Sequence, residues 1–130
     1  MDRNLLILVA RLCLSAVYLY SALDKLIYWR NGLALVARHR LTPHHPVLVA
    51  TIAVQLAGGL MVLLGIWARE GAILLLLFTL IATIRVHFPT GLRGEDFRRE
   101  TTISLEHLGI IGGLLMIAVI GPGDYVLMPR

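Results

Sequence analysis

One apolar segment, residues 51–67, constrains the fold of this chain more than any other feature. It is long enough to cross a bilayer and carries a single amide side chain, Gln55, near its middle. Four other residues share its face at helical spacing: Thr51, Gly58, Gly59 and Val62. Small residues let a neighbouring backbone approach closely in lipid, and a buried amide needs a partner on another helix. We therefore expect this helix to lie inside a bundle with the Gln55 face turned inward.

The rest of the chain has the composition of an integral membrane protein. Hydrophobic residues make up 58% of its 130 residues, and the mean hydropathy is +0.80. A water-soluble domain of this size has no interior large enough to hide that much apolar surface. We expect an all-α membrane protein, with residues 1–130 forming a single four-helix up-down bundle. The expected spans are 5–26, 47–67, 72–88 and 104–120, and a short interfacial helix is expected at 32–41.

The connections between these spans predict the orientation of the bundle. A tight turn at 68–71 makes the second and third spans antiparallel neighbours, whereas 91–102 is expected to be a solvated, mixed-charge loop. One side of the membrane then holds both termini, with Arg3, Arg69 and Arg130. The other side holds Lys25, Arg30, Arg38, Arg40, Arg93, Arg98 and Arg99, with Arg85 at the edge of a span. The positive-inside rule places this second side in the cytoplasm and both termini outside.

The net charge of +4 is therefore explained by loop charges that set orientation. No nucleic-acid partner is expected. Cys13 is the only cysteine, so the chain has no internal disulfide. The adjacent His44 and His45 have no further ligands nearby, so no metal site is expected.

Arg11 places a charge within the first span, where it is costly. At the bilayer centre an arginine costs about 2.5–3.5 kcal/mol on insertion scales. It shares a helical face with Ser15, Tyr18, Ala22 and Lys25. Two interpretations stay open: Arg11 reaches the nearby N-terminal interface with its long side chain, or it faces the bundle interior.

Glycines mark expected close approaches between helices. Gly58 and Gly59 lie on the inward face of the second span. The fourth span carries Gly109 and Gly113 in a Gly-x-x-x-Gly pattern, together with Gly112. All five are expected to face other helices.

Polar side chains from all four spans converge on one end of an up-down bundle. This expected polar cluster consists of Lys25, Gln55, Arg85, His87, Glu106 and His107. Gln55 lies too deep for simple interfacial placement, and Glu106 is expected to pair with Lys25, Arg85 or His87. The ordinary polarity of helix ends is the structural alternative. No catalytic residue is assignable from the sequence.

The same residues carry a resemblance to the DoxX family of small four-span membrane proteins. The segment from Arg11 through 18–26, ending in Lys25-Leu26, is similar to that family's first helix, and 55–65 resembles its second-helix signature. His87 stands where the family's third helix often carries a histidine, and 106–115 resembles the start of its fourth helix. The family commonly has glutamate where this chain has Gln55, so a titratable group expected from the resemblance is absent.

The resemblance implies a multi-pass protein of the bacterial inner membrane that associates with redox enzymes. Some relatives are subunits of a thiosulfate:quinone oxidoreductase, others associate with oxidative-stress defence enzymes, and animal relatives act in receptor assembly. Our first hypothesis is an accessory or quinone-interacting subunit of a membrane oxidoreductase system, because His, Gln, Lys and Arg donors near the interface suit the carbonyls of a quinone. Its expected partners are the lipid bilayer, a membrane-associated redox enzyme and, as an open option, further copies of the chain. The alternatives are a non-enzymatic scaffold or assembly factor, a small transporter or proton-coupled carrier, and haem ligation by His87 and His107.

Overall fold

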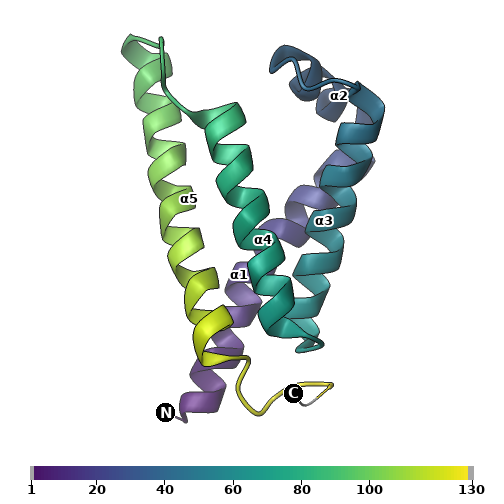
Figure 1. Ribbon diagram of the computed structural model, residues 1–130, viewed down its shortest axis with the longest axis vertical. Helices are drawn as coiled ribbons and strands as arrows, with labels where there is room; N and C mark the ends of the chain where they lie inside the picture. The colour runs from purple at the N-terminus through teal and green to yellow at the C-terminus, as the bar shows by residue number, and fades with distance from the viewer. Residues whose placement is uncertain (1, 129–130) are drawn as a thin grey trace.

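The computed structural model describes residues 2–128, which form helices joined by short connections (Figure 1). The helices are α1 (Arg3–Ile27), α2 (Trp29–Arg38), α3 (His44–Leu64), α4 (Ala68–Ala82) and α5 (Gly94–Ile120), and one turn of π-helix, η1 (Thr83–His87), continues α4. The described part contains no strands, and four of its segments are long and apolar enough to span a membrane: α1, α3, α4 with η1, and α5. The expected all-helical fold with four spans is confirmed.

The spanning helices run alternately up and down, so both chain ends and the α3–α4 connection gather at one end of the bundle (Figure 1). Helix α1 packs on α3, α3 on α4 and α4 on α5, whereas α1 and α5 meet over a much shorter length. Toward the other end, α3 with α2 diverges from α4 with α5. The bundle is therefore closed at the end that holds the termini and open at the end that holds α2.

Two clusters of buried apolar side chains hold the helices together. The larger joins α1, α3, α4 and α5 through Tyr18, Val62, Ala72, Leu75, Leu114 and Ile117. The smaller joins α1, α2 and α3 through Ala22, Val36, Leu48 and Ile52. Helix α2 is amphipathic, with apolar residues along one face and polar residues on the other. The second cluster holds its apolar face across the end of the bundle.

The connection between the second and third spans differs from the expected turn at 68–71. Helix α3 ends at Leu64, because Gly65 adopts a left-handed conformation (φ 70°) that closes the last helical turn. Trp67 is also left-handed (φ 50°), and α4 begins at Ala68. The turn is therefore 65–67, and Gly71 lies instead in the first part of α4, where it faces α3.

The expected loop at 91–102 is shorter than predicted, because α5 already begins at Gly94. The mixed charges of this stretch pair along the helix: Arg98 Nη1 lies 3.8 Å from Glu95 Oε1, and Arg99 Nη2 lies 3.1 Å from Asp96 Oδ1. Acidic residues in a first turn also complement the helix dipole. Alternating charge is thus compatible with a solvated helix. The fourth helix begins about three turns before the expected apolar span at 104–120.

The five glycines expected to mediate packing divide into two groups. A Cβ atom at Gly58 would lie 2.6 Å from Leu75 Cγ, one at Gly59 would lie 2.9 Å from Leu19 Cδ2, and one at Gly113 would lie 3.1 Å from Leu14 Cδ2. These three lie against other helices. Gly109 and Gly112 are exposed, and a Cβ atom at either would meet nothing within 4 Å. The packing role expected for them is not fulfilled by any helix of this chain.

Arg11 faces the interior and is almost completely buried, with 1% of its surface exposed. Its guanidinium donates hydrogen bonds to four backbone carbonyls. Nε binds Val62 O at 2.8 Å and Nη2 binds Leu63 O at 2.8 Å, both in the last turn of α3. Nη1 binds Pro122 O at 3.0 Å and Tyr125 O at 2.6 Å, in the segment that follows α5. Of the two interpretations of Arg11, the structure supports the interior one.

We expect Gly58→Ala to destabilise the bundle and Gly112→Ala to leave it unchanged or slightly more stable. At position 58 the new methyl group overlaps Leu75, which is fully buried and has no space to move into. Overpacking of this kind costs about 1–3 kcal/mol. At position 112 the methyl group meets nothing. Thermal unfolding in one detergent measures both, and equal tolerance would contradict close α3–α4 packing at Gly58.

We expect Arg11→Met to lower the free energy of unfolding by about 3 kcal/mol or more, because it leaves several buried carbonyls without donors. Arg69→Met is the matched control. Arg69 also binds carbonyls at a helix end, those of Ala118, Val119 and Ile120, but from an exposed position. Its loss is expected to cost clearly less in the same unfolding assay. A smaller effect for Arg11→Met than for Arg69→Met would contradict the assigned role.

Candidate functional site

A pocket of about 380 Å³ opens between the helices at the end that carries α2, where the two halves of the bundle diverge. We call it the interhelical pocket. Most of its wall is apolar, with contributions from α1, α2, α3, α4, η1 and α5. Five of the six residues of the expected polar cluster line it: Lys25, Gln55, Arg85, His87 and His107. The sixth, Glu106, is exposed and is not part of the wall.

One wall of the pocket is a small polar network between α1 and α3. Lys25 Nζ donates to Ser21 Oγ at 2.6 Å, and Gln55 Nε2 donates to the same oxygen at 3.1 Å. Gln55 is 5% exposed, and its Oε1 atom has no hydrogen-bond partner among the described residues. An unpaired buried acceptor is unfavourable unless another group satisfies it.

The opposite wall is formed by two histidines. His87 Nδ1 lies 2.9 Å from Glu100 Oε2, and the His87 and His107 rings meet edge to face with centroids 5.1 Å apart. His107 Nδ1 lies 2.8 Å from Thr83 Oγ1. Each imidazole therefore has one nitrogen held by a neighbour, which fixes the orientation of the ring in the wall of the pocket.

The π-helical turn η1 helps to position this wall. Thr79, Thr83 and His87 are spaced by four residues, and the wider π turn, with hydrogen bonds between residues five apart, keeps such residues aligned along one face. Ser104 Oγ donates to His87 O at 2.9 Å and ties the end of η1 to α5. Pro89 follows directly and prevents the helix from continuing.

Hydroxyl groups complete the part of the pocket between the two walls. Tyr18 and Thr79 are buried and joined by a hydrogen bond between their hydroxyls, and Thr79 Oγ1 donates to Leu75 O at 2.7 Å. Because the Thr79 proton goes to this carbonyl, Tyr18 is the donor to Thr79. Both residues line the pocket.

The structure places further polar residues at this site that the predicted cluster did not contain, among them Ser21, Thr79, Thr83 and Glu100. Ser21 stands four residues before Lys25, and the two threonines are also four apart, so helical spacing was an available signal for them. Glu100 had none, because it lies in a run of charges that the sequence assigns to a loop. It takes the place expected of Glu106, which makes no ion pair within residues 2–128.

Arg11 lies apart from this site, at the opposite, closed end of the bundle. In the part of the chain that the structure describes, no three His, Cys, Asp or Glu side chains are grouped to hold a metal ion. The chemical capacity of the pocket is therefore that of an apolar cleft with hydrogen-bond donors, imidazoles and a cationic ammonium group at one end.

Comparison with known proteins assigns the chain to a family. The chain is 25% identical to the inner membrane protein YphA of Escherichia coli (strain K12) over 130 residues, which cover 98% of this chain and 91% of YphA. It is 28% identical to the inner membrane protein YqjF of the same organism over 123 residues, with 92% of this chain and 86% of YqjF covered. No solved structure matches the chain at a significant level. The model of the DoxX family matches residues 6–88, from α1 through η1, and the chain therefore belongs to the DoxX family of integral membrane proteins.

Proposed function

We propose that the interhelical pocket binds the ring of a quinone, and that the chain acts as an accessory, quinone-interacting subunit of a membrane oxidoreductase system. The observation that carries this proposal is the pairing of apolar walls with polar groups on two opposite sides of one pocket. A quinone ring is flat and apolar and has a carbonyl at each of two opposite positions. Its oxidised form needs a donor on each side, and its reduced form, which has a hydroxyl group at each position, is also bound by acceptors. Both forms need an apolar passage for the tail.

The wall made by α1 and α3 suits one end of such a ring. The Lys25 ammonium has three protons, and a single described hydrogen bond, to Ser21, uses one of them. A ligand oxygen at this wall accepts a charge-assisted hydrogen bond, which is stronger than a neutral one. The free Gln55 Oε1 suits a hydroxyl group, which is what the reduced form of the ring presents.

The histidine wall suits the other end. His87 Nδ1–H donates to Glu100. Because the Thr83 hydroxyl proton goes to Thr79 O, His107 Nδ1–H donates to Thr83. The Nε2 atoms of the neutral rings therefore carry lone pairs that accept hydrogen bonds from a hydroxyl of the reduced ring. Glu100 is only 16% exposed at its side chain, so its link to His87 is shielded in part from water. A carboxylate paired with an imidazole is well suited to accept a proton from a ligand hydroxyl or return it.

The main alternative is a non-enzymatic scaffold or assembly factor. The observation that favours it is that Lys25, His87 and His107 each already have a partner inside the bundle. In that case the polar contacts stabilise helix packing, and the pocket has no ligand of its own. A transporter would need the pocket to continue through the closed end, where Arg11 and the main core cluster fill the bundle.

We expect wild-type protein in detergent to bind reduced decylubiquinol under anaerobic conditions and His87→Ala to bind it about tenfold more weakly, because the hydrogen bond from a ring hydroxyl to His87 Nε2 is lost. His45→Ala is the matched control: His45 is exposed at the start of α3 and does not line the pocket. Isothermal titration measures affinity, and thermal unfolding verifies that both variants are folded. Absence of binding by the wild type, or equal affinity in all three proteins, would favour the scaffold.

For orientation, we propose that the closed end faces away from the cytoplasm and that the pocket end faces it, in a bacterial inner membrane. Two features support this proposal: the excess of Arg and Lys at the pocket end, and the location of the YphA and YqjF relatives. Because Arg11 is buried, it does not alter the loop charge difference.

Alkaline phosphatase fused to the C-terminus is therefore expected to be active, and green fluorescent protein fused there is expected to be dark. The same reporters inserted between α4–η1 and α5, in the 88–93 connection, are expected to give the opposite pattern. Reversal of both patterns would overturn the orientation without affecting the fold.

A further inference from the structure

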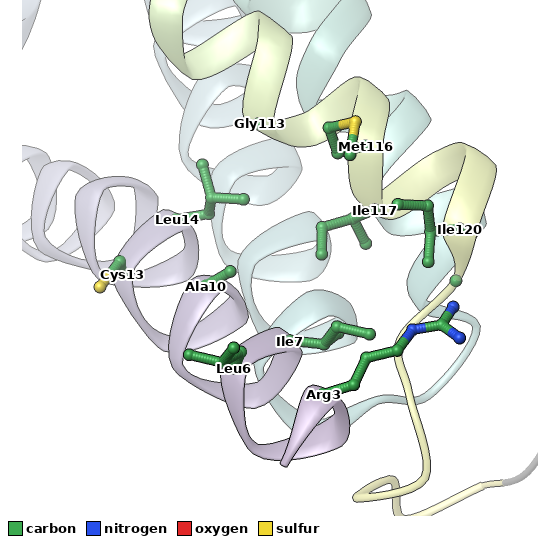
Figure 2. Close-up of a pocket in the computed structure, with 11 residues that line it drawn as sticks. Arg3, Leu6, Ile7, Ala10, Cys13, Leu14, Gly113, Met116, Ile117 and Ile120 are labelled. Atoms are coloured by element: carbon green, nitrogen blue, oxygen red, sulfur yellow. The ribbon is translucent and has the colours of Figure 1, made fainter. Parts of the chain in front are cut away.

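A second hollow lies at the closed end, between α1 and α5, and we call it the α1–α5 groove. It has a volume of about 530 Å³ and exists because these two helices meet over only a short length. Figure 2 shows apolar side chains of α1 facing apolar side chains of α5 across it. The groove is lined chiefly by Leu6, Ala10 and Leu14 from α1 and by Gly113, Met116 and Ile117 from α5. At Gly113 the two helices are in contact through Leu14, and the groove extends from this contact toward the chain ends.

A cation stands at the end of this groove. Arg3 lines it and extends from the first turn of α1 toward Ile120 at the end of α5 (Figure 2). Its side chain is exposed and makes no hydrogen bond or ion pair with any residue in 2–128. The carboxylates of Asp2 and Asp124 each accept a hydrogen bond from Asn4. A free guanidinium beside an apolar groove in a membrane protein is complementary to a phosphate group attached to a hydrocarbon chain.

The length of the groove distinguishes between candidate occupants. On α1 it runs from Arg3 to Leu14, which at the helical rise is about 16 Å. This is about half of the roughly 30 Å thickness of the hydrocarbon core. The groove therefore has the depth of one leaflet, with its charged end at the membrane surface. A spanning helix of a second copy crosses such a groove and contacts only part of it, whereas an acyl chain of one leaflet fills it from end to end.

We propose that the α1–α5 groove binds a phospholipid, with one acyl chain between α1 and α5 and the phosphate against Arg3. This site is at the opposite end of the bundle from the interhelical pocket and does not depend on the quinone proposal. The side chains of α1 and α5 touch over only a short length. A lipid in the groove contacts both helices and so fills the space between them as part of the packed structure.

Native mass spectrometry of protein in mild detergent with added phosphatidylglycerol tests the proposal. Wild type is expected to retain one lipid per chain. Arg3→Gln is expected to weaken retention about fivefold, the effect of one arginine at an anionic surface. Ala10→Phe, which fills the groove, is expected to abolish it. The matched controls are Arg93→Gln, an exposed arginine at the other end, and Ala57→Phe, on the lipid-facing side of α3; both are expected to retain lipid as the wild type does.

A second measurement on the unmodified protein guards against variants that fail to fold. Phosphatidylglycerol with a photoreactive acyl chain is expected to label peptides 6–14 and 113–120 in preference to the rest of the chain. The proposal is overturned if the wild type retains no lipid, if Ala10→Phe retains it normally, or if labelling is uniform around the bundle. It is also overturned if the wild type is a dimer that Ala10→Phe converts to a monomer, because a second copy then fills the groove.

Discussion

The hydrogen bonds of Arg11 are the interaction on which the closed end of this bundle depends. Its guanidinium joins the last turn of α3 to the segment after α5, using carbonyls that no helical N–H group can satisfy. Arg69 does the same at lower burial for the last turn of α5. A cation at the C-terminal end of a helix also complements the helix dipole. Two arginines thus supply the hydrogen-bond donors that the last carbonyl groups of α3 and α5 would otherwise find in water or in a polar loop.

This arrangement explains why the bundle is closed at one end and open at the other. At the closed end, the segment after α5 is held by Arg11 and by the hydrogen bond from Leu127 N to Leu64 O at 2.9 Å. At the other end, α2 packs on α1 and α3 and on no other described helix, and the π turn η1 directs the end of the third span toward α5. The helices diverge there, and the interhelical pocket occupies the space between them. Ligand sites commonly lie where helices of a bundle separate in this way.

The four spans and the inward faces of the first two were predictable, because lipid leaves little freedom in where apolar runs and buried polar groups lie. Helical periodicity placed Arg11 on one face with Ser15, Tyr18 and Ala22 but left open whether Arg11 reached the interface or the interior. Its partners were not predictable, since backbone carbonyls carry no sequence signal. Helix ends were less well predicted. The charged start of α5 was assigned to a loop. A helix supported by i,i+3 ion pairs and a solvated loop both have a mixed-charge sequence, so composition does not distinguish them. Of the Gly109-x-x-x-Gly113 motif with Gly112, only Gly113 lies against another described helix, because the motif does not specify which face of α5 turns inward.

The same limit on sequence information explains which part of the candidate site was missed. Four of the predicted polar residues of the pocket come from the ends of the expected spans, where an up-down bundle must bring them together, and Gln55 comes from the inward face of the second span. Glu100 lies six residues before Glu106, about 1.7 helical turns, outside the apolar run. It reaches His87 because α5 continues as a helix beyond the span. That extension places a carboxylate where the pocket meets the solvent-exposed part of the bundle. A carboxylate deeper in the bundle would need a cation of its own, whereas at this level it is neutralised in part by Arg99, 3.6 Å away, and still orients the imidazole. The charged helical extension is therefore a structural element of the pocket, since it supplies the residue that holds one of its two histidines.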